Sequence, residues 1–336
     1  MTKKYVLIFY LLFTAQFLFG QVVKILGHNQ SCSIRGLSVV DNKVAWISGS
    51  KGHVAKTTNG CKTWNWQQVK GFEQSDFRDI EAFSAKEAII MSSGAPALIL
   101  KTADGGLSWK VVYRNDDKAY FLDAMAFSDL KTGYVLGDPI NSKFLLLETK
   151  DSGKNWKPLP NAPAALPGEA AFAASGTCIS ANGSIGFVTG GSNSRLITSD
   201  PSRLNWSGAI LPINQGNSSK GAFSIASGNG NIVIVGGDYA NNKAVDSVAC
   251  YADFKSRNKD FRPTQHNPAG YQSGITYLKG NIFLSTGTSG TNITIDGGKN
   301  WKQIDIRSFN VCQKAKNGNL VLLAGDRGLI AVFKNH

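Results

Sequence analysis

The sequence is poor in the side chains that bind metals and redox cofactors. Its 336 residues include five cysteines and four histidines, and no two cysteines form a C-x-x-C pair. The histidines do not have the spacing of a metal-ligand set, and no dinucleotide-binding fingerprint stands between a strand and a helix. We therefore expect no metal and no cofactor, and the sequence argues against an oxidoreductase. The histidines are His28, His53, His266 and His336.

The cysteines give no disulfide framework. They are odd in number and widely spaced, so the sequence cannot pair them, although one or two disulfides would be compatible with an oxidising compartment. Buried free thiols are the default interpretation. The cysteines are Cys32, Cys61, Cys178, Cys250 and Cys312.

No apolar run beyond the first twenty residues is long enough to cross a bilayer. Lys3 and Lys4 precede an apolar run from Tyr5 to Phe19, which is typical of a secretory signal. We expect residues 1–20 to be a signal peptide cleaved after Gly20, with the mature protein (21–336) exported to the periplasm or the extracellular space. Leu18 is large for a small-x-small cleavage site, so an uncleaved anchor is the alternative.

The chain is basic, and its formal charge of +13 falls to +11 when the two leader lysines are removed. A basic surface favours acidic partners, and no cluster of basic and aromatic residues supports nucleic-acid binding. We expect a monomer whose partner is a protein or an anionic glycan. A solvated lysine-rich surface is the plainer explanation of the charge.

One short motif recurs along the chain. TTNGCKTW (57–64), TADGGLSW (102–109), TKDSGKNW (149–156) and TIDGGKNW (294–301) share a Thr, an Asp or Asn and a Trp at fixed offsets. TSDPSRLNW (198–206) and YADFKSRNKDF (251–261) are weaker copies. The motif tryptophans are 45, 47, 50 and 95 residues apart, and the last step is two repeats long.

Each motif follows an apolar run that ends in Gly, such as VAWISG or AIIMSSG, and another short strand precedes that run. A repeated four-stranded unit of about 40–50 residues is a β-propeller blade. We predict an all-β, seven-bladed propeller of four-stranded antiparallel blades. The predicted blades are 34–70, 77–113, 121–160, 171–212, 222–262, 273–305 and 309–333, the last completed by the N-terminal strand at 22–27.

The motif has a structural explanation. An Asp side chain accepts hydrogen bonds from turn amides, the following Gly permits a positive φ, and the Trp covers apolar surface between sheets. We interpret the motif as a joint that needs no ligand. Its key residues are Asn59, Trp64, Asp104, Trp109, Asp151, Trp156, Asp200, Trp206, Asp253, Phe261, Asp296 and Trp301.

The motif resembles the Asp-box, or bacterial neuraminidase repeat, of sialidases and related propellers. The segment IRGLSVVDNKVAWISGSKGHVAKTTNGCKTW at 34–64 resembles the first blade of the photosystem II stability/assembly-factor propellers of plants and cyanobacteria, which have exported bacterial relatives. The resemblance spans the mature chain and implies a non-enzymatic binding or assembly module with a protein partner. Asn59, Cys61 and the degenerate fifth repeat depart from the pattern.

Candidate binding residues lie on the face opposite the motif turns, where inner strands begin and second and third strands connect. In one interpretation they form a polar face for an acidic or zwitterionic partner. In the other, Arg35, Arg78, Asp79 and Asp123 form ion pairs between blades, with Arg35 aligned to Arg78 and Asp79 to Asp123. The candidates are Arg35, Arg78, Asp138, Glu169, Asp238, Tyr271, Asp326 and Arg327.

A glycoside hydrolase acting on extracellular glycans is the alternative function. Sialidase-type enzymes use three arginines, a Tyr activated by Glu, and an Asp acid/base. Tyr271 and Glu169 are the available pair, but Arg35 lies in SIRG where those enzymes have F/Y-R-I-P, and no third clamp arginine is evident. Hydrolysis by another carboxylate pair stays open.

Overall fold

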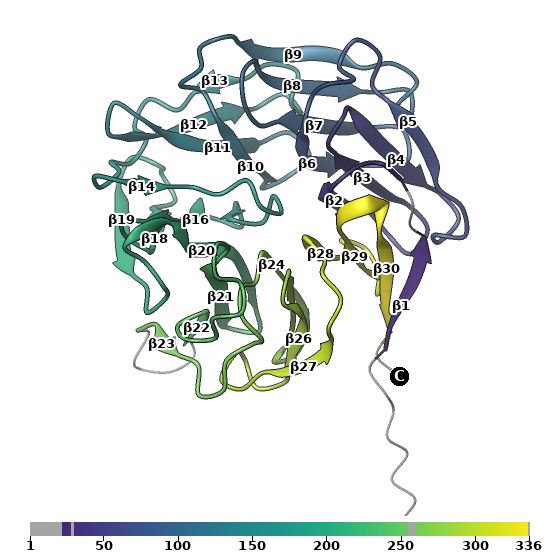
Figure 1. Cartoon of the computed structure of the whole chain (residues 1–336). Coiled ribbons are helices and arrows are strands. Elements are labelled where there is room, and N and C mark those ends of the chain that lie inside the picture. Colours follow the sequence, from purple (N-terminus) through teal and green to yellow (C-terminus); the bar gives the residue numbers. More distant parts are fainter. Residues whose placement is uncertain (1–21, 28–29, 255–259, 335–336) are drawn as a thin grey trace, which may run out of the picture.

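The computed structural model describes residues 22–27, 30–254 and 260–334, which form a ring of seven sheets (Figure 1). These residues contain 30 strands, one 3-10 turn and no α-helix. The prediction of an all-β, seven-bladed propeller with antiparallel blades is confirmed. The predicted signal peptide, residues 1–20, lies outside the described residues, and within them no helix is long and apolar enough to span a membrane.

The blades follow one another around the ring in chain order. The first blade consists of β2 (Ile34–Val39), β3 (Ala45–Gly49), β4 (His53–Thr57) and β5 (Asn65–Gln68). The second consists of β6 (Phe77–Ala82), β7 (Ala88–Ser92), β8 (Ala97–Thr102) and β9 (Lys110–Asn115). The third consists of β10 (Leu122–Phe127), β11 (Gly133–Ile140), β12 (Lys143–Thr149) and β13 (Lys157–Pro158).

The next three blades keep this order. They are β15 (Ile179–Ser180), β16 (Gly186–Val188), β18 (Arg195–Ser199) and β19 (Trp206–Ile210); β20 (Asn217–Gly228), β21 (Asn231–Asp238), β22 (Ala249–Asp253) and β23 (Arg262–Pro263); and β24 (Gly274–Lys279), β25 (Ile282–Gly287), β26 (Gly290–Thr294) and β27 (Lys302–Asp305).

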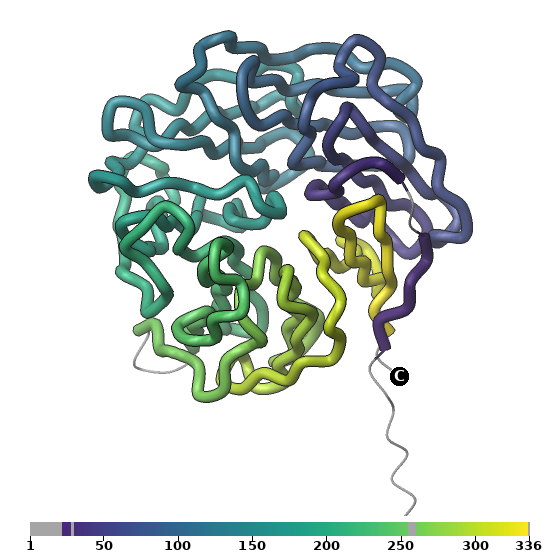
Figure 2. The backbone as a smooth tube through the Cα atoms, viewed as in Figure 1, coloured from purple at the N-terminus to yellow at the C-terminus, as the bar shows by residue number. Residues whose placement is uncertain are grey.

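The seventh blade is closed by the N-terminal strand, as the sequence predicts. Strand β1 (Val22–Gly27) pairs with β30 (Ile330–Lys334), which continues into β29 (Val321–Ala324) and β28 (Val311–Lys314). Val23 lies opposite Phe333, and both side chains are buried in one cluster. Figure 2 shows the two ends of the described chain side by side. This pairing leaves no open strand edge at the join.

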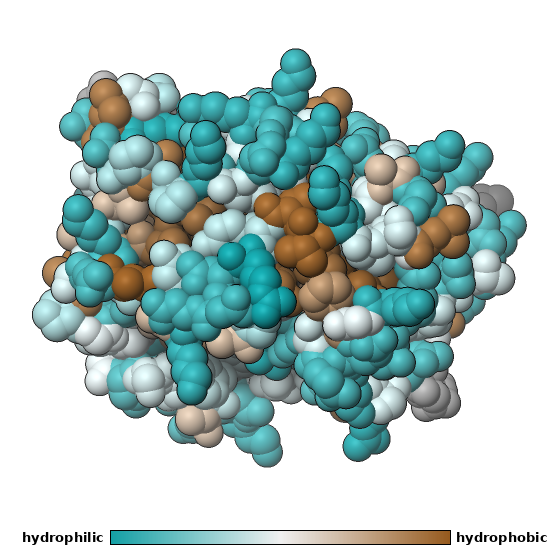
Figure 3. All heavy atoms as spheres, turned by 90° about the horizontal axis from the view of Figure 1, so that it is seen from above, coloured by the Kyte–Doolittle hydropathy of each residue, from teal (hydrophilic) through white to brown (hydrophobic). Residues whose placement is uncertain are grey.

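The core lies between neighbouring blades rather than inside any one of them. The second strands β3 and β7 are buried along their whole length, because each is covered by sheets on both faces. The outer strand β9 is half-exposed to fully exposed. The rim seen in Figure 3 is accordingly mostly hydrophilic, with an apolar patch near the centre of the view and smaller apolar areas elsewhere.

One sheet differs from the predicted four-stranded pattern. The fifth blade carries two extra strands, β14 (Glu169–Ala170) and β17 (Gly190–Gly191), which join it to the fourth blade. A Cβ built on Gly190 would lie 2.5 Å from the Cα of Gly221 and 2.4 Å from the ring of Phe172. Only glycine permits that approach, so the two blades are held together on the face where the inner strands begin.

Candidate functional site

The four complete motif turns share one hydrogen-bond pattern. In the third blade, Thr149 Oγ1 donates to Asp151 at 2.9 Å and accepts from the amide of Gly153 at 3.0 Å. Asp151 also accepts from the amide and the side chain of Asn155 at 2.9 and 2.7 Å. These bonds hold the pKa of Asp151 down at about 2, the largest cause being the Asn155 side chain. The turns at Thr57, Thr102 and Thr294 make matching Thr and Asp or Asn bonds.

Each motif turn also packs against the preceding blade. Gly298 has φ +95, and a Cβ there would lie 3.0 Å from Val233 and Tyr251 of the fifth blade. Trp301 joins the same cluster and is 8% exposed. The Lys101 ammonium donates to the carbonyl of Ser152 in the next turn at 2.7 Å. The motif therefore connects blades in addition to shaping one hairpin.

The departures from the motif keep part of this geometry. Cys61, where the other turns have Gly, adopts φ +67 and buries its thiol. Asp200 accepts from the amide of Leu204 at 3.1 Å and from Asn205 at 2.7 Å. In the fifth blade, Asp253 ends β22 and Phe261 is half-buried, while residues 255–259 lie outside the described residues. All five cysteines are free and buried.

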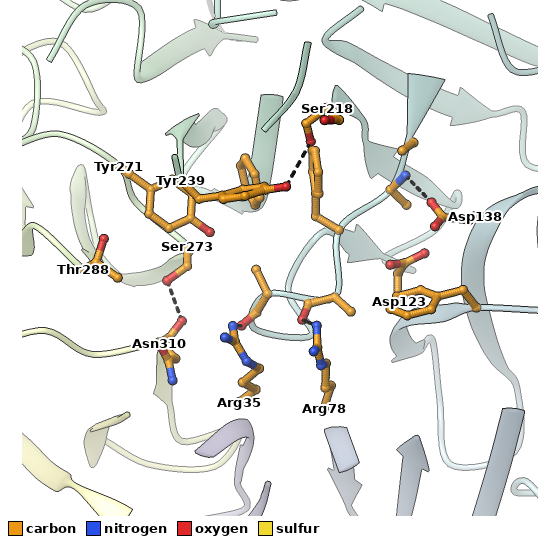
Figure 4. Close-up of a pocket in the computed structure, with 17 residues that line it drawn as sticks. Arg35, Arg78, Asp123, Asp138, Ser218, Tyr239, Tyr271, Ser273, Thr288 and Asn310 are labelled. Carbon is orange, nitrogen blue, oxygen red and sulfur yellow. Dashed lines mark hydrogen bonds between the residues drawn. The ribbon is translucent and has the colours of Figure 1, made fainter. Parts of the chain in front are cut away.

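A cavity of about 470 Å³ opens on the opposite face, at the centre of the ring (Figure 4). Four of the eight predicted binding residues line it, namely Arg35, Arg78, Asp138 and Tyr271. Its other walls include the segment 170–174 and the side chains of Asp123, Phe223 and Tyr239. Within the described residues, no three His, Cys, Asp or Glu side chains are grouped as a metal site would need.

A repeated backbone irregularity aims side chains into this cavity. In four blades the pairing of the first two strands shifts by one residue beside the cavity, a β-bulge, and the bulged residues are Arg35, Arg78, Asp123 and Phe223. All four line the cavity. Bulges commonly re-aim a side chain beside a functional site. This register corrects the sequence alignment, because Asp123 corresponds to Arg78 rather than to Asp79.

The two arginines do not form the ion pairs between blades that one interpretation of the sequence predicted. Arg78 pairs with Asp76 of its own blade, with Nε 2.7 Å from the carboxylate. Arg35 makes no ion pair with any described residue. Both guanidinium groups instead point towards the segment 170–174 of the same chain. Arg35 donates to the carbonyl of Ala174 at 3.3 Å, and Arg78 to that of Ala173 at 3.5 Å.

The segment 170–174 is held at the cavity by further contacts. Asp138 accepts a hydrogen bond from the amide of Ala171 at 3.1 Å. The ring of Phe172 stacks on Phe223, with centroids 3.9 Å apart and planes at 15°. Tyr271 packs edge-on against Phe223 at 4.9 Å. Sequence reasoning overlooked this segment, and its only signal was the apolar run AAFAA after Glu169.

Three carboxyl groups lie in or beside the cavity, two of them buried and that of Asp138 half-buried, and burial raises the pKa of each. Asp79 accepts the amides of Ile80 and Met125 at 2.7 and 2.6 Å, and its pKa rises to about 8. Burial raises the pKa of Asp123 well above its usual range, and the nearby Asp138 raises it further while Arg78 opposes this. The pKa of Asp138 is also raised by burial.

The other four predicted residues, Glu169, Asp238, Asp326 and Arg327, do not line the cavity. Glu169 accepts two bonds from Arg195, with Oε2 2.5 Å from Nη2, and one from Thr189, so its carboxylate does not contact Tyr271. Asp238 accepts hydrogen bonds from the amides of Ala240 and Asn241 in its turn. Burial raises the pKa of Tyr271 on the cavity wall. Asp326 accepts from Ser33 and from Asn310, the latter at 3.0 Å. Arg327 is exposed and has φ +58.

Another cavity, of about 580 Å³, lies among the motif turns of the second and third blades. Its walls carry Lys101, Lys110 and Lys154, beside Asp104. Lys101 is already engaged by Ser152 and by Glu87, whose carboxylate is 3.1 Å away. The Asp104 carboxylate is taken up by its own turn. The central cavity is therefore the better candidate site, because its Arg35 forms no ion pair with a described residue and interacts only at longer range with the Asp326 carboxylate.

Comparison with known proteins agrees with the fold. Residues 24–119 match the family model of the photosynthesis system II assembly factor YCF48. The chain is 28% identical over 120 residues to the chloroplast photosystem II stability/assembly factor HCF136 of Oryza sativa subsp. japonica. That match covers 35% of this chain and 27% of the rice protein, so the chain matches about a quarter of the length of this curated relative.

Solved structures of YCF48 share the whole ring. YCF48 bound to a D1 peptide superimposes with a TM-score of 0.66 at 16% identity, covering 94% of this chain and 97% of that one. YCF48 from Cyanidioschyzon merolae gives 0.65 at 15% identity, covering 93% and 98%. The WD40 domain of Neurospora crassa Pan2 gives 0.64 at 14% identity, covering 90% and 89%. At these identities the structures show the fold alone, while the sequence matches show that this propeller resembles the photosystem II assembly factors.

Proposed function

We propose that this chain is an exported, non-enzymatic propeller that binds an acidic segment of a partner protein at the central cavity. The observation that carries the proposal is Arg35. Its guanidinium lies on the cavity wall, makes no ion pair with a described residue, and has a single long bond to a backbone carbonyl. A guanidinium presents five donors in a planar fork suited to a carboxylate.

Three further observations support this proposal. The cavity volume of about 470 Å³ is in the usual range for a ligand site. The aromatic rings of Phe172, Phe223 and Tyr239 give the cavity an apolar wall beside the charges. The resemblance to YCF48, one structure of which holds a D1 peptide, favours a peptide as the ligand. The basic net charge would assist the approach of an acidic partner.

Binding of short acidic peptides to the purified mature chain tests this function. We expect Arg35→Gln and Arg78→Gln each to weaken an acidic peptide about tenfold, because each removes a charge-assisted contact. Arg114→Gln is the matched control, since Arg114 is exposed on the outer strand β9 and pairs with Asp116. Fluorescence anisotropy gives the affinities. Equal losses in all three variants, or no loss at Arg35, would contradict the proposal.

Export is a separate part of the proposal and needs its own experiment. The basic start and apolar run of residues 1–20 support a cleaved leader. We expect the mature protein to begin at Gln21 and to fractionate outside the cytoplasm, and deletion of residues 2–20 to keep it inside. N-terminal sequencing of the purified protein measures the first, and cell fractionation the second. A mature protein that retains Lys3 would show that the leader is not cleaved.

A glycoside hydrolase remains the second candidate because Asp123 and Asp138 place two carboxyl groups with raised pKa values on one cavity wall. The sialidase version of this hypothesis lacks its Tyr–Glu pair, since Arg195 and Thr189 take up Glu169. Turnover of a panel of fluorogenic glycosides, including a sialoside, separates the two functions. Turnover that Asp138→Asn abolishes would replace the binding proposal.

A further inference from the structure

Asp123 is a buried carboxyl group that the fold leaves unused. Its side chain is fully buried on the wall of the central cavity, yet neither carboxyl oxygen has a hydrogen-bond partner among the described residues. The amide of Ala173 approaches it without reaching a normal hydrogen-bond geometry. A buried, unpaired carboxyl group is costly, so its presence calls for a reason that the folded chain alone does not supply.

Asp79 shows what a structural aspartate looks like in the same region. It is equally buried, but its two oxygens accept the amides of Ile80 and Met125, and the second bond ties the second blade to the third. Asp123 makes no equivalent bond to the fourth blade. It stands instead at the bulge position that Arg35 and Arg78 occupy in the first two blades. The bulge therefore directs the Asp123 side chain into the cavity, as it directs the side chains of Arg35 and Arg78.

The cavity consequently has two chemical poles. Arg35 and Arg78 lie side by side on one wall, and Asp123 and Asp138 lie together on the adjoining wall, on the side of Arg78 (Figure 4). The stacked rings of Phe172 and Phe223 add an apolar wall. An acidic ligand alone would satisfy the arginines and leave the carboxyl pole empty. A group that also carries a positive charge would satisfy both poles.

We infer that Asp123 is the specificity-determining residue of this cavity, and that the cavity selects a mixed-charge protein segment, with a carboxylate for the arginines and a lysine-type ammonium for Asp123 and Asp138. This inference rests on the proposed function, because it assumes that the cavity holds a peptide segment. The inference adds a positive charge on the bound segment, which neither the net charge of this chain nor its arginines would require. The segment 170–174 occupies part of this space, its carbonyls facing the arginines, and it brings no ammonium to Asp123.

Three short peptides of equal length test the charge requirement. One carries a Glu and a Lys, the second has Gln in place of the Lys, and the third has Gln in place of the Glu. We expect the mixed-charge peptide to bind the mature chain about tenfold more tightly than either single-charge peptide, as close charge pairs in interfaces do. Equal binding of the mixed-charge and acidic peptides would overturn the inference and leave the proposed function standing. No binding by any of them would overturn both.

The variants Asp123→Asn and Arg35→Gln assign each charge to its pole. Asp123→Asn should remove the advantage of the lysine and leave the acidic peptide within about twofold of its wild-type affinity, since the arginines are untouched. Arg35→Gln should weaken binding of the acidic peptide and keep the advantage that the lysine gives. Arg114→Gln should change neither the affinity of the acidic peptide nor the advantage of the lysine. A loss by Asp123→Asn that is equal for every peptide would indicate a structural role and overturn the inference.

Proton release gives a readout on the wild-type chain, independent of how the variants fold. The groups facing Asp123 are Asp138 and the Cys178 thiol, both acids, and the Arg78 guanidinium. An incoming ammonium favours the ionised carboxyl group, so binding should release a proton and tighten as the pH rises. Calorimetry in two buffers of different ionisation enthalpy measures this. The acidic peptide should release none, and equal release for both peptides would contradict the inference.

Discussion

The motif turns and the cavity wall are both repeated geometries, but only the motif turns repeat their chemistry. Four turns place a Thr and an Asp or Asn in the same hydrogen-bonded arrangement and follow them with a Trp at a fixed offset. The bulges on the opposite face repeat a backbone shape and fill it with Arg, Arg, Asp and Phe. A constant side chain on a constant backbone is what a joint requires. A varied side chain on a constant backbone is what a binding surface requires.

The aspartates of the two regions also differ in how fully their carboxyl oxygens are satisfied. Each oxygen of Asp151 has a partner within its own turn, whereas neither oxygen of Asp123 has one among the described residues. Satisfied groups stabilise the fold, and unsatisfied buried groups destabilise it unless a ligand completes them. The comparison therefore predicts that changes in the turns lower stability and spare binding, and that changes at the cavity do the opposite.

Gly298→Ala should have the largest effect on stability. Gly298 combines φ +95 with a close approach to Val233 and Tyr251, so a methyl group would meet backbone strain and rigid neighbours together. We expect the free energy of unfolding to fall by about 2–3 kcal/mol. Gly183→Ala is the control, because Gly183 has φ +81 and open space around it, and should cost about 1 kcal/mol. Denaturant unfolding measures both, and equal losses would show that the turn does not press on the neighbouring blade.

The pH dependence of stability should separate the two regions by sign. Asp104 and Asp151 have pKa values lowered to about 2 by hydrogen bonds within their turns, so the stability they contribute is lost as the pH falls from about 4 towards 2. Asp79 has a pKa raised to about 8 by burial, so stability falls as the pH rises from about 4 towards 8.

Thermal unfolding across this range should therefore give a maximum near pH 4, with one limb from each region. Asp151→Asn should flatten the acid limb, because Asn cannot titrate. Asp79→Asn should flatten the limb that extends towards pH 8, although the lost amide bond lowers stability overall. The measured quantity is the slope of each limb. A profile that rises steadily up to pH 8 would contradict the raised pKa of Asp79.

The sequence predicted the fold well because local sequence patterns determine the strands and turns of a propeller. The motif spacing, the glycine-terminated apolar runs and the unpartnered segment 22–27 each have a short-range physical cause, and together they define the ring and its closure. The extra pairing of β14 and β17 was not predicted. It depends on the contact of Gly190 with Gly221, two glycines from different blades whose proximity no local pattern reveals.

The site was predicted only in part, because its key features are long-range contacts. Arg35 and Arg78 were found from their alignment, but their contact with residues 173 and 174 depends on how one long connection folds back over the ring. Asp123 was matched to Asp79, one residue out of register, because the bulge that shifts it leaves no mark in the sequence. Glu169 was assigned to the binding face without its partner Arg195, which is 26 residues away.

Asp123→Asn should have a smaller effect on stability, with the opposite sign to the turn variants. Asn requires neither a buried charge nor a bound proton at this pH, so we expect the free energy of unfolding at pH 8 to rise by about 1 kcal/mol. At pH 4 the carboxyl group is already neutral and the gain should vanish. Asp116→Asn, in an exposed ion pair, is the control and should change stability little at either pH. A loss of stability at pH 8 would show that Asp123 supports the fold.

The smallest effect is expected from two arginines with the same backbone conformation on opposite faces. Arg327, on the cavity face, has φ +58, and Arg203, in the fourth motif turn, has φ +62. Arg203 lies over the ring of Tyr134, 5.3 Å from its centroid, while Arg327 is exposed beside Asp326. Arg327→Gly should raise the free energy of unfolding by about 0.5 kcal/mol, because glycine tolerates this φ.

Arg203→Gly gains the same relief but loses a cation–π contact worth about 0.5–1 kcal/mol, so its net effect should be zero or slightly destabilising. Denaturant midpoints measured side by side resolve the difference. An acidic peptide should bind Arg327→Gly within about threefold of wild type, since an exposed charge mainly assists approach. If Arg327→Gly instead lost binding as completely as Arg35→Gln, the binding surface would extend from the cavity onto the turn at residues 326–328.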